Sequence, residues 1–338
     1  MPTTRSHMPN DGRPRLDAAT AAVRVGVRRS LASCSDGATV LACVSGGADS
    51  MALAAALVFE AESRSIQVHS VTVDHGLQPG SGDVAERTAQ TLGTWGIEAH
   101  VEQVSVTDAG GPEAAARDAR YRAIDAIADR IGAELVLLGH TLDDQAESVL
   151  LGLARGSGAG SLKAMASLTG RYARPLLGVR RQQTQDSCRE RGIEVWSDPQ
   201  NEDAAFARVR ARTVVLPVFD HELGPGIAEA LARTAEQARE DEEAFEQMIG
   251  EFIEEICEPA EAGISVEASA LAHNPAALRN RVIRYVANAE FGVSLSRAHT
   301  LAIAALVTAW RGQGPIDVPG ISVSRRDDRI VFTAAEKA

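Results

Sequence analysis

The hydrophobic positions between residues 38 and 141 follow two alternating rhythms. Four short runs rich in β-branched residues, ATVLACV, IQVHSVTVD, EAHVEQVSV and ELVLLGHT, each precede a longer segment with apolar residues at helical spacing. These helical segments cover residues 49–63, 82–95, 112–131 and 144–153. The order is typical of βαβ units, so the sequence predicts a doubly wound α/β domain, with helices on both faces of a parallel sheet.

The pattern changes in the second half of the chain. A helix is predicted near residues 181–191, and an acidic stretch at 222–258 keeps apolar positions at the spacing of one long helix. Two helical patterns, 270–290 and 295–310, and short strands around GPIDV, ISVSR and RIVFT follow. We therefore expect a disordered tail at 1–15, the α/β domain at 16–218, an acidic linker helix at 219–262 and a small α+β domain at 263–338.

Length and composition agree with two globular domains. The chain has 338 residues, of which 45% are hydrophobic and 24% charged. No apolar run reaches the roughly 20 residues of a membrane helix, and the start, MPTTRSHMPNDGRPR, lacks the apolar core of a signal peptide. Four cysteines lie far apart in the sequence and suggest neither zinc nor a redox pair. We expect a cytoplasmic protein with no membrane partner.

The net charge of −12 is concentrated in one segment. Residues 220–262 contain fourteen acids and two arginines, so the rest of the chain has 32 acids and 32 bases. The acidic run is explained by the solvated face of a helix. The net charge therefore does not exclude a nucleic acid partner for the remaining surface.

A glycine-rich loop separates the first predicted strand from its helix. This loop, SGGADS, consists of Ser45, Gly46, Gly47, Ala48, Asp49 and Ser50. Glycines after a strand let backbone N–H groups approach a phosphate, and the next helix directs its positive end there. Asp49 fits either a magnesium ion carried by the phosphate or the N-cap of the helix. The loop is neither a Walker loop nor GxGxxG, and its plainest alternative is a tight turn.

Three carboxylates follow the last predicted strand in GHTLDDQAESVL. Asp144 and Glu147 share a helix face, and Asp143 lies near the N-cap position. They either cap the helix and complement its dipole, or form a pocket for magnesium or an amine. Three neighbouring carboxylates repel one another unless cations lie close to them.

Several blocks resemble known families. SGGADS resembles the SGGxDS signature of the PP-loop ATP pyrophosphatases, which split ATP between its α and β phosphates. GHTLDDQAESVLLGLARGSG resembles the HxxDDQAET and RGSG block of the tRNA(Ile)-lysidine synthases. VDHGLQPGSGDVAER, EAAARDARY, YARPLLGVRR and SDPQN are similar to further blocks of the same family, in the same order.

The resemblance implies a reaction and its participants. Members use ATP to adenylate the oxygen on carbon 2 of the wobble cytidine of an isoleucine tRNA with anticodon CAU, and free lysine then displaces AMP. ATP and magnesium are the implied cofactors. Catalytic roles are implied for Asp49, Arg117, Asp143, Asp144 and Glu147. Lysine contacts are implied for Arg117, Asp144 and Glu147. ATP contacts are expected from residues 45–50 and from Asp74, His75, His140 and Arg155.

Simpler explanations exist for some of these residues. His75 and His140 end strands, where a histidine is more often just hydrogen-bonded. Arg155 is also explained as a solvated surface arginine. They stay in the candidate site as nucleotide contacts.

The candidate tRNA contacts are arginines. The family's RNRIR block appears here as RVRAR, with Val209 in place of the asparagine. Arginines at every second position would splay around a helix or line one face of a strand, and the sequence leaves both conformations open. The small domain is basic between residues 265 and 332, with eight arginines against five acids. Phosphate contacts or a merely solvated basic surface both explain this charge. The tRNA candidates are Arg208, Arg210, Arg212, Arg279, Arg281, Arg284, Arg325 and Arg326.

Two other functions stay open. One is a PP-loop enzyme that thiolates tRNA, which would favour paired cysteines; the other is a nucleotide-binding sensor without catalysis. A homodimer is possible, because apolar helix faces serve cores and interfaces alike.

Overall fold

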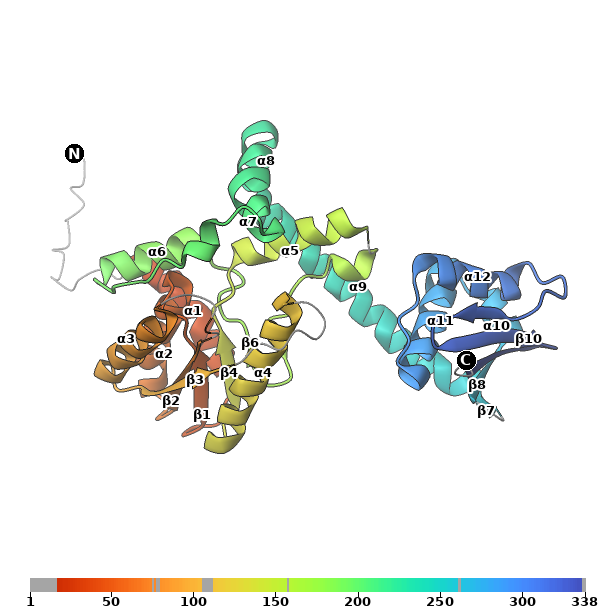
Figure 1. The fold of residues 1–338 in the computed structure, drawn as a ribbon, viewed down its shortest axis with the longest axis horizontal. Helices are drawn as coiled ribbons and strands as arrows, with labels where there is room; N and C mark the ends of the chain where they lie inside the picture. The colour runs from red at the N-terminus through yellow and green to blue at the C-terminus, as the bar shows by residue number, and fades with distance from the viewer. Residues whose placement is uncertain are drawn as a thin grey trace, which may run out of the picture. The chain divides into compact units, whose positions relative to one another are not determined.

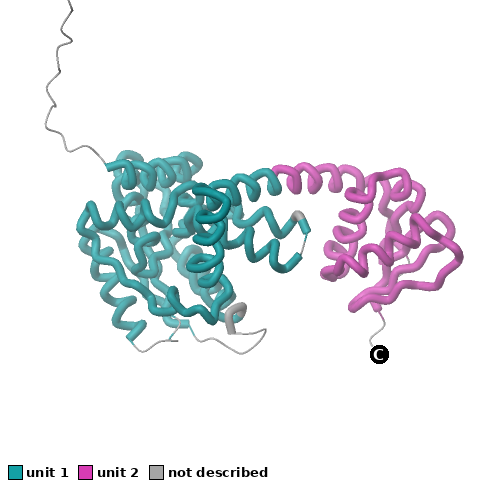
Figure 2. Tube along the Cα trace, turned by 90° about the horizontal axis from the view of Figure 1, so that it is seen from above, with its two compact units in different colours: residues 1–239 teal, residues 240–338 magenta. Residues whose placement is uncertain are grey.

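A computed structural model describes residues 17–74, 76, 80–104, 112–156, 158–260 and 263–335. The chain forms two compact units, residues 1–239 and 240–338 (Figure 2). The boundary between them falls within helix α9 (Ile227–Ile256). Among the described residues, no helix is both long and apolar enough to span a membrane.

The first unit contains the predicted α/β sheet (Figure 1). Its strands run in the order β3-β2-β1-β4-β6-β5 and are parallel except for β5. They are β1 (Thr39–Cys43), β2 (Gln67–Asp74), β3 (Glu98–Gln103), β4 (Leu135–Leu138), β5 (Leu168–Thr169) and β6 (Tyr172–Ala173). Strand order reverses between β1 and β4, and in such sheets the ligand crevice lies beyond the carboxyl ends of the strands at that switch point.

Helices flank the sheet on both faces. They are α1 (Ala18–Leu31), α2 (Ala48–Glu62), α3 (Ser81–Thr94), α4 (Pro112–Ile131), α5 (Leu142–Arg155), α6 (Arg181–Glu190), α7 (Ala207–Arg210) and α8 (Leu216–Leu223), with short turns η1 (Ala159–Ser161), η2 (Pro199–Glu202) and η3 (Ala211–Val215).

Alternate residues of β1 supply two hydrophobic cores. Val40 and Ala42 pack with residues of α1 and α2, whereas Leu41 and Cys43 pack with Ile124 and other residues of α4. Because both faces of this central strand are buried, its sequence reads as a continuous apolar run. The predicted fold class is confirmed.

The structure distinguishes between the two conformations open to the RVRAR segment. Arg208, Arg210 and Arg212 lie in α7 and the π-helical turn η3, with Val209 and Ala211 buried, so the extended basic edge is not formed. The long acidic helix is present as α9, which starts at Ile227 after the glycines at 224 and 226 that separate it from α8.

The second unit is a sheet covered by helices. Its strands run antiparallel in the order β7-β8-β11-β10-β9. The strands are β7 (Cys257–Ala260), β8 (Gly263–Glu267), β9 (Ile316–Val318), β10 (Ile321–Arg326) and β11 (Arg329–Ala334), and the helices besides α9 are α10 (Ala268–His273), α11 (Ala276–Phe291) and α12 (Arg297–Thr308). The sequence patterns missed β7 and β8 and did not separate α10 from α11, which Asn274 and Pro275 divide.

Candidate active site

The glycine-rich loop connects strand β1 to helix α2, as the sequence predicts. Ser50 fixes its shape, because the Ser50 hydroxyl donates to the Gly47 carbonyl at 2.9 Å and accepts the Ser45 N–H at 3.1 Å. Gly46 has a φ of 86°, a conformation that favours glycine. Gly47 is the N-cap residue of α2, so Asp49 does not take that role.

The end of β4 packs tightly against this loop. A Cβ atom on Gly139 would lie 3.2 Å from the Ser50 nitrogen and 3.3 Å from the Asp49 carbonyl carbon. A side chain at this position would press on the backbone of the loop, so a glycine fits this close approach best. The two walls on either side of the switch point therefore meet at Gly139.

Two neighbouring cavities open beside the loop. The larger has a volume of about 600 Å³ and is lined by the loop, by His140, Asp144, Arg181 and Arg212, and by Trp196. The smaller, about 230 Å³, is lined by residues of β2 including Asp74. Cys43, Ser45, Arg120 and Trp196 border both.

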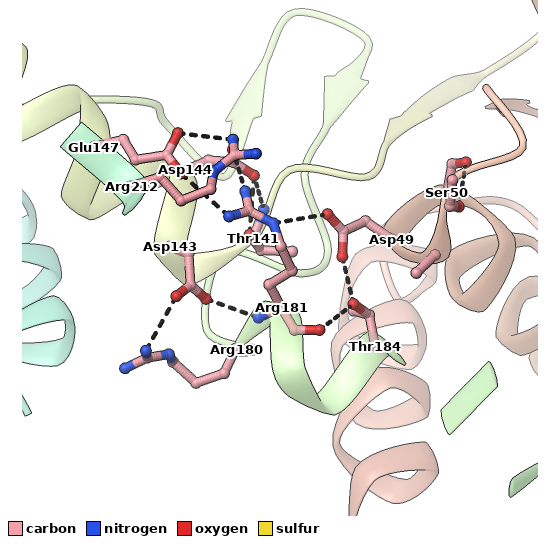
Figure 3. A network of polar contacts seen from close by, with 12 residues as sticks. Asp49, Ser50, Thr141, Asp143, Asp144, Glu147, Arg180, Arg181, Thr184 and Arg212 are labelled. Carbon is pink, nitrogen blue, oxygen red and sulfur yellow. Dashed lines mark hydrogen bonds and ion pairs between the residues drawn. The ribbon is translucent and has the colours of Figure 1, made fainter. Parts of the chain in front are cut away.

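Arg181, the first residue of α6, lies between the two walls of the larger cavity. Figure 3 shows its guanidinium between Asp49 of α2 and the carboxylates of α5. Its Nε is 3.4 Å from Asp49, its Nη2 2.9 Å from Asp144 and its Nη1 3.2 Å from Glu147. The positive charge beside this carboxylate cluster comes from arginines of the chain, which the sequence patterns did not indicate.

The three carboxylates of α5 have different surroundings. Asp144 is the third residue of the helix, and its Oδ2 accepts hydrogen bonds from the Thr141 N–H and hydroxyl, so the simple capping reading holds for this oxygen. Glu147 is fully buried, and Arg212 binds it with two nitrogens at 2.7 and 3.2 Å. Asp143 accepts the Arg181 backbone N–H at 2.7 Å and pairs with Arg180.

The pKa values of two carboxylates move in opposite directions. Burial raises the pKa of Asp49, although the Thr184 hydroxyl and the Arg181 charge oppose this effect. Burial also acts to raise the pKa of Asp144, but the charge of Arg181 and the hydrogen bonds from Thr141 outweigh it, so this pKa lies below its ordinary value. Asp49 therefore binds a proton more readily than Asp144.

Candidate nucleotide contacts fall in several places. His140 lines the larger cavity, burial lowers its pKa to about 4, and its Nδ1 finds no hydrogen-bond partner among the described residues. Asp74 accepts the Gly76 N–H at 2.9 Å in the smaller cavity. Arg155 is exposed in the last turn of α5. His75 lies outside the described residues.

Arg120 lines the two cavities, whereas Arg117 is not among their lining residues. Arg117 is exposed on α4, with its guanidinium over the Tyr121 ring, whereas Arg120 lines both cavities. Both belong to EAAARDARY. Positions three apart on one helix differ by about 60° in direction, which the block alone does not reveal.

Sequence reasoning also missed Arg181 and Trp196. Arg181 stands in YARPLLGVRR, but its carboxylate partners lie 34, 37 and 132 positions away in the chain. The backbone N–H of Trp196 donates to the Gly46 carbonyl at 2.9 Å, and this hydrogen bond holds the 193–198 segment against the loop. Such long-range partners leave no local signal in the sequence.

The arginines of the second unit differ in whether their side chains are bound within the protein or exposed. Arg281 pairs with Glu242 at 2.9 Å and covers the Phe245 ring, and Arg279 and Arg325 donate to backbone carbonyl groups. Arg284 and Arg326 are exposed. The latter two are therefore the more available for phosphate.

One cluster of possible metal ligands lies elsewhere. In the described ranges, His69, Glu98 and His100 form the one group of three close enough to hold an ion. The His69 Nδ1 and His100 Nε2 atoms are 3.3 Å apart, the ring centres 5.6 Å apart, and the planes within 3°. The ring centres are farther apart than the two nitrogens by about two ring radii, so both nitrogens lie on the line between the ring centres. They therefore face each other in a hydrogen bond and do not point together at a third site.

Two protein families match this chain. The PP-loop domain family matches residues 23–219, and the TilS substrate binding domain matches residues 267–331. A tRNA(Ile)-lysidine synthase of Leifsonia xyli subsp. xyli is 53% identical over 298 residues, which cover 88% of this chain and 90% of that protein. Another, of Thermobifida fusca, is 47% identical over 320 residues, covering 94% and 98%.

A solved structure shares the fold of a large part of this chain. The U34-tRNA thiolase NcsA from Methanococcus maripaludis, solved with its [4Fe-4S] cluster, has a TM-score of 0.56 and covers 65% of this chain and 79% of its own. Since the two are only 16% identical, the likeness shows a common fold alone.

Proposed function

The chain belongs to the tRNA(Ile)-lysidine synthase family, and we propose that its larger cavity uses ATP to join lysine to carbon 2 of the wobble cytidine of an isoleucine tRNA with anticodon CAU. One observation carries this proposal for the site. The glycine-rich loop, which suits the phosphates of ATP, and Asp144, which suits an amine, line one cavity, and Arg181 bridges Asp49 of the loop and Asp144.

The loop is the ATP end of the cavity. Backbone N–H groups of residues 45–50 and the N-terminus of α2 favour the phosphates of ATP. The oxygen on carbon 2 of the cytidine attacks the α-phosphorus, and the bond to the departing pyrophosphate breaks. Arg120, at the border of both cavities, is suited to the negative charge on these phosphates.

Asp49 fits a magnesium ion carried by the nucleotide. Magnesium commonly takes one or two carboxylates together with substrate phosphates, and Asp49 lines the cavity directly after the phosphate loop. When bound, the ion would offset the charge of the phosphates. Asp49 would hold it from the α2 side.

The carboxylates of α5 are the lysine end of the cavity. Asp144 lines the cavity and offers its Oδ1 to the lysine ammonium, while Glu147, fully buried, positions Arg212. The lysine amine loses a proton, attacks carbon 2, and AMP leaves with the oxygen. A neighbouring carboxylate of the cluster takes the proton.

Exposed arginines are proposed as tRNA contacts. In the first unit Arg208 and Arg210 are exposed, and in the second Arg284 and Arg326. Phosphate contacts of this kind position an RNA without reading its bases. A tRNA substrate also implies that the protein works in the cytoplasm.

The cysteines do not support a thiolation reaction. All four lie in the described part of the chain and are free thiols. Cys43 is the one that lines the cavities, and burial raises its pKa to about 12. A thiol with that pKa stays protonated at neutral pH and is a poor nucleophile.

The proposal is tested by incorporation of labelled lysine. An unmodified isoleucine tRNA with anticodon CAU is incubated with the protein, ATP and magnesium, beside the initiator methionine tRNA as control. Label on the isoleucine tRNA alone is expected. Formation of AMP and pyrophosphate with another acceptor, and no lysine transfer, would contradict the lysine assignment; no ATP cleavage with either tRNA would favour a sensor.

A further inference from the structure

The amine end of the cavity already contains a cation. Arg181 touches Asp49, Asp144 and Glu147, and only 19% of its side chain is exposed. Burial acts against its charge, but these carboxylates more than offset that effect and raise its pKa. The guanidinium thus lies where a substrate ammonium would find its negative partners.

Each carboxylate of this cluster already has an arginine partner. Asp49 and Asp144 pair with Arg181, and Glu147 pairs with Arg181 and Arg212. An ammonium that binds to these carboxylates therefore competes with an arginine for them.

Arg181 is the arginine that can leave. Arg212 is bound by two nitrogens to Glu147 and lies 4.0 Å from Asp144, whereas Arg181 makes a single hydrogen bond with each of three carboxylates. Its charge also lies at the N-terminus of α6, which the helix dipole disfavours. Its backbone stays fixed when the side chain moves, because the Arg181 N–H is held by Asp143.

The phosphates of ATP provide a competing partner. They would bind at the loop beside Asp49, and a guanidinium pairs strongly with phosphate oxygens. Arg181 would turn from the carboxylates toward this charge and release Asp49 and Asp144.

We propose that Arg181 is a positioning residue that occupies the amine site until ATP is bound, so that lysine binds after ATP. The proposal rests on the lysine-joining function proposed above. It makes the two substrates thermodynamically coupled, since each would favour the same position of Arg181.

Calorimetric titration of lysine into the full-length protein tests this coupling. The titration is made with and without an ATP analogue that carries a methylene group between its α and β phosphates. In the wild type, the analogue should tighten lysine binding by about tenfold or more, a coupling of ordinary size between two sites. In Arg181→Gln, lysine affinity should be nearly the same with and without the analogue.

Two further variants separate coupling from damage to the fold. Arg189 lies on the same helix, its side chain is 67% exposed, and among the described residues it pairs only with Asp186. The variant Arg189→Gln should therefore behave as the wild type. Arg181→Lys keeps the charge and should restore part of the coupling. A purely structural role for Arg181 would lower lysine affinity equally in both titrations.

The outcomes test the role of Arg181 separately from the proposed lysine-joining function. Suppose that the wild type incorporates lysine into tRNA but its affinity for lysine is the same with and without the analogue, or that it binds lysine in neither titration. The proposed role of Arg181 is then overturned and the proposed function stands. The same holds if Arg181→Gln keeps the full coupling. If the wild type incorporates no lysine, the proposed function fails and the inference fails with it.

Discussion

Arg181 Nη2 and Asp144 Oδ1 lie 2.9 Å apart and join helix α6 to helix α5 across the rim of the cavity. The same carboxylate closes the first turn of α5 through Thr141. One side chain therefore serves both the helix and the site, and its substitution has two separable effects.

Asp144→Asn should impair the use of lysine far more than the binding of ATP. The amide keeps a hydrogen-bond acceptor but loses the charge that attracts an ammonium. We expect kcat/KM for lysine to fall about 100-fold, with the KM for ATP changed less than about threefold. An unchanged lysine dependence would remove Asp144 from the amine site. Thr141→Val, which weakens the cap alone, is the matched control and should lower stability by about 1 kcal/mol.

His140 should make stability depend on pH. Its pKa is about 4 in the folded protein and about 6.5 in the unfolded chain, so the unfolded chain binds the proton first as pH falls. The contribution of His140 to the free energy of unfolding is therefore full above pH 6.5. It is lost as the pH falls from 6.5 to 4, and the loss is on the order of 3 kcal/mol. Urea unfolding of His140→Asn should lack this loss. His221→Asn, at an exposed histidine, should retain it.

Gly139→Ala should disturb the phosphate loop. The new methyl group would press on the backbone of Asp49 and Ser50, which has no flexible end that can give way. We expect a loss of about 1–3 kcal/mol in the free energy of unfolding and a KM for ATP raised about tenfold. Gly178→Ala, where a Cβ meets no atom within 4 Å, is the control. Equal behaviour of the two variants would show that the contact does not shape the loop.

Arg284→Ala combined with Arg326→Ala should weaken tRNA binding and its dependence on salt. The slope of log affinity against log salt should fall by about 1 for each phosphate contact removed. Filter binding at several salt concentrations measures this slope. Arg281→Ala should instead lower the melting temperature of the second unit, because Arg281 pairs with Glu242. A slope changed by Arg281→Ala alone would reverse these assignments.

Local patterns predicted the fold and the phosphate loop, because both depend on neighbours in sequence. The apolar run 40–44 and the glycines after it determine a strand and its turn without distant partners. Thr141 and Asp144 also form a local signature, a hydroxyl three residues before a carboxylate, so the capping role was readable from the sequence. The conformation of the RVRAR segment stayed open because the burial of Val209 and Ala211 depends on the tertiary fold.

The distribution of charge in the site was not predictable in this way. Asp49, Asp144, Glu147 and Arg181 come from three helices, and their pairing arises only when α2, α5 and α6 pack on one sheet. The sequence identified the carboxylates through their own block. The arginine that neutralises them stood in another block, where nothing nearby marks its partners.

The position of Trp196 beside both cavities, where its backbone N–H binds Gly46, gives the site an optical reporter. The chain has three tryptophans; Trp196 borders both cavities, whereas Trp95 follows α3 and Trp310 lies in the second unit. With Trp95 and Trp310 replaced by phenylalanine, the remaining indole emission would follow the arrival of ATP in real time. The order in which the substrates enter would then become visible as successive changes in one fluorescence trace.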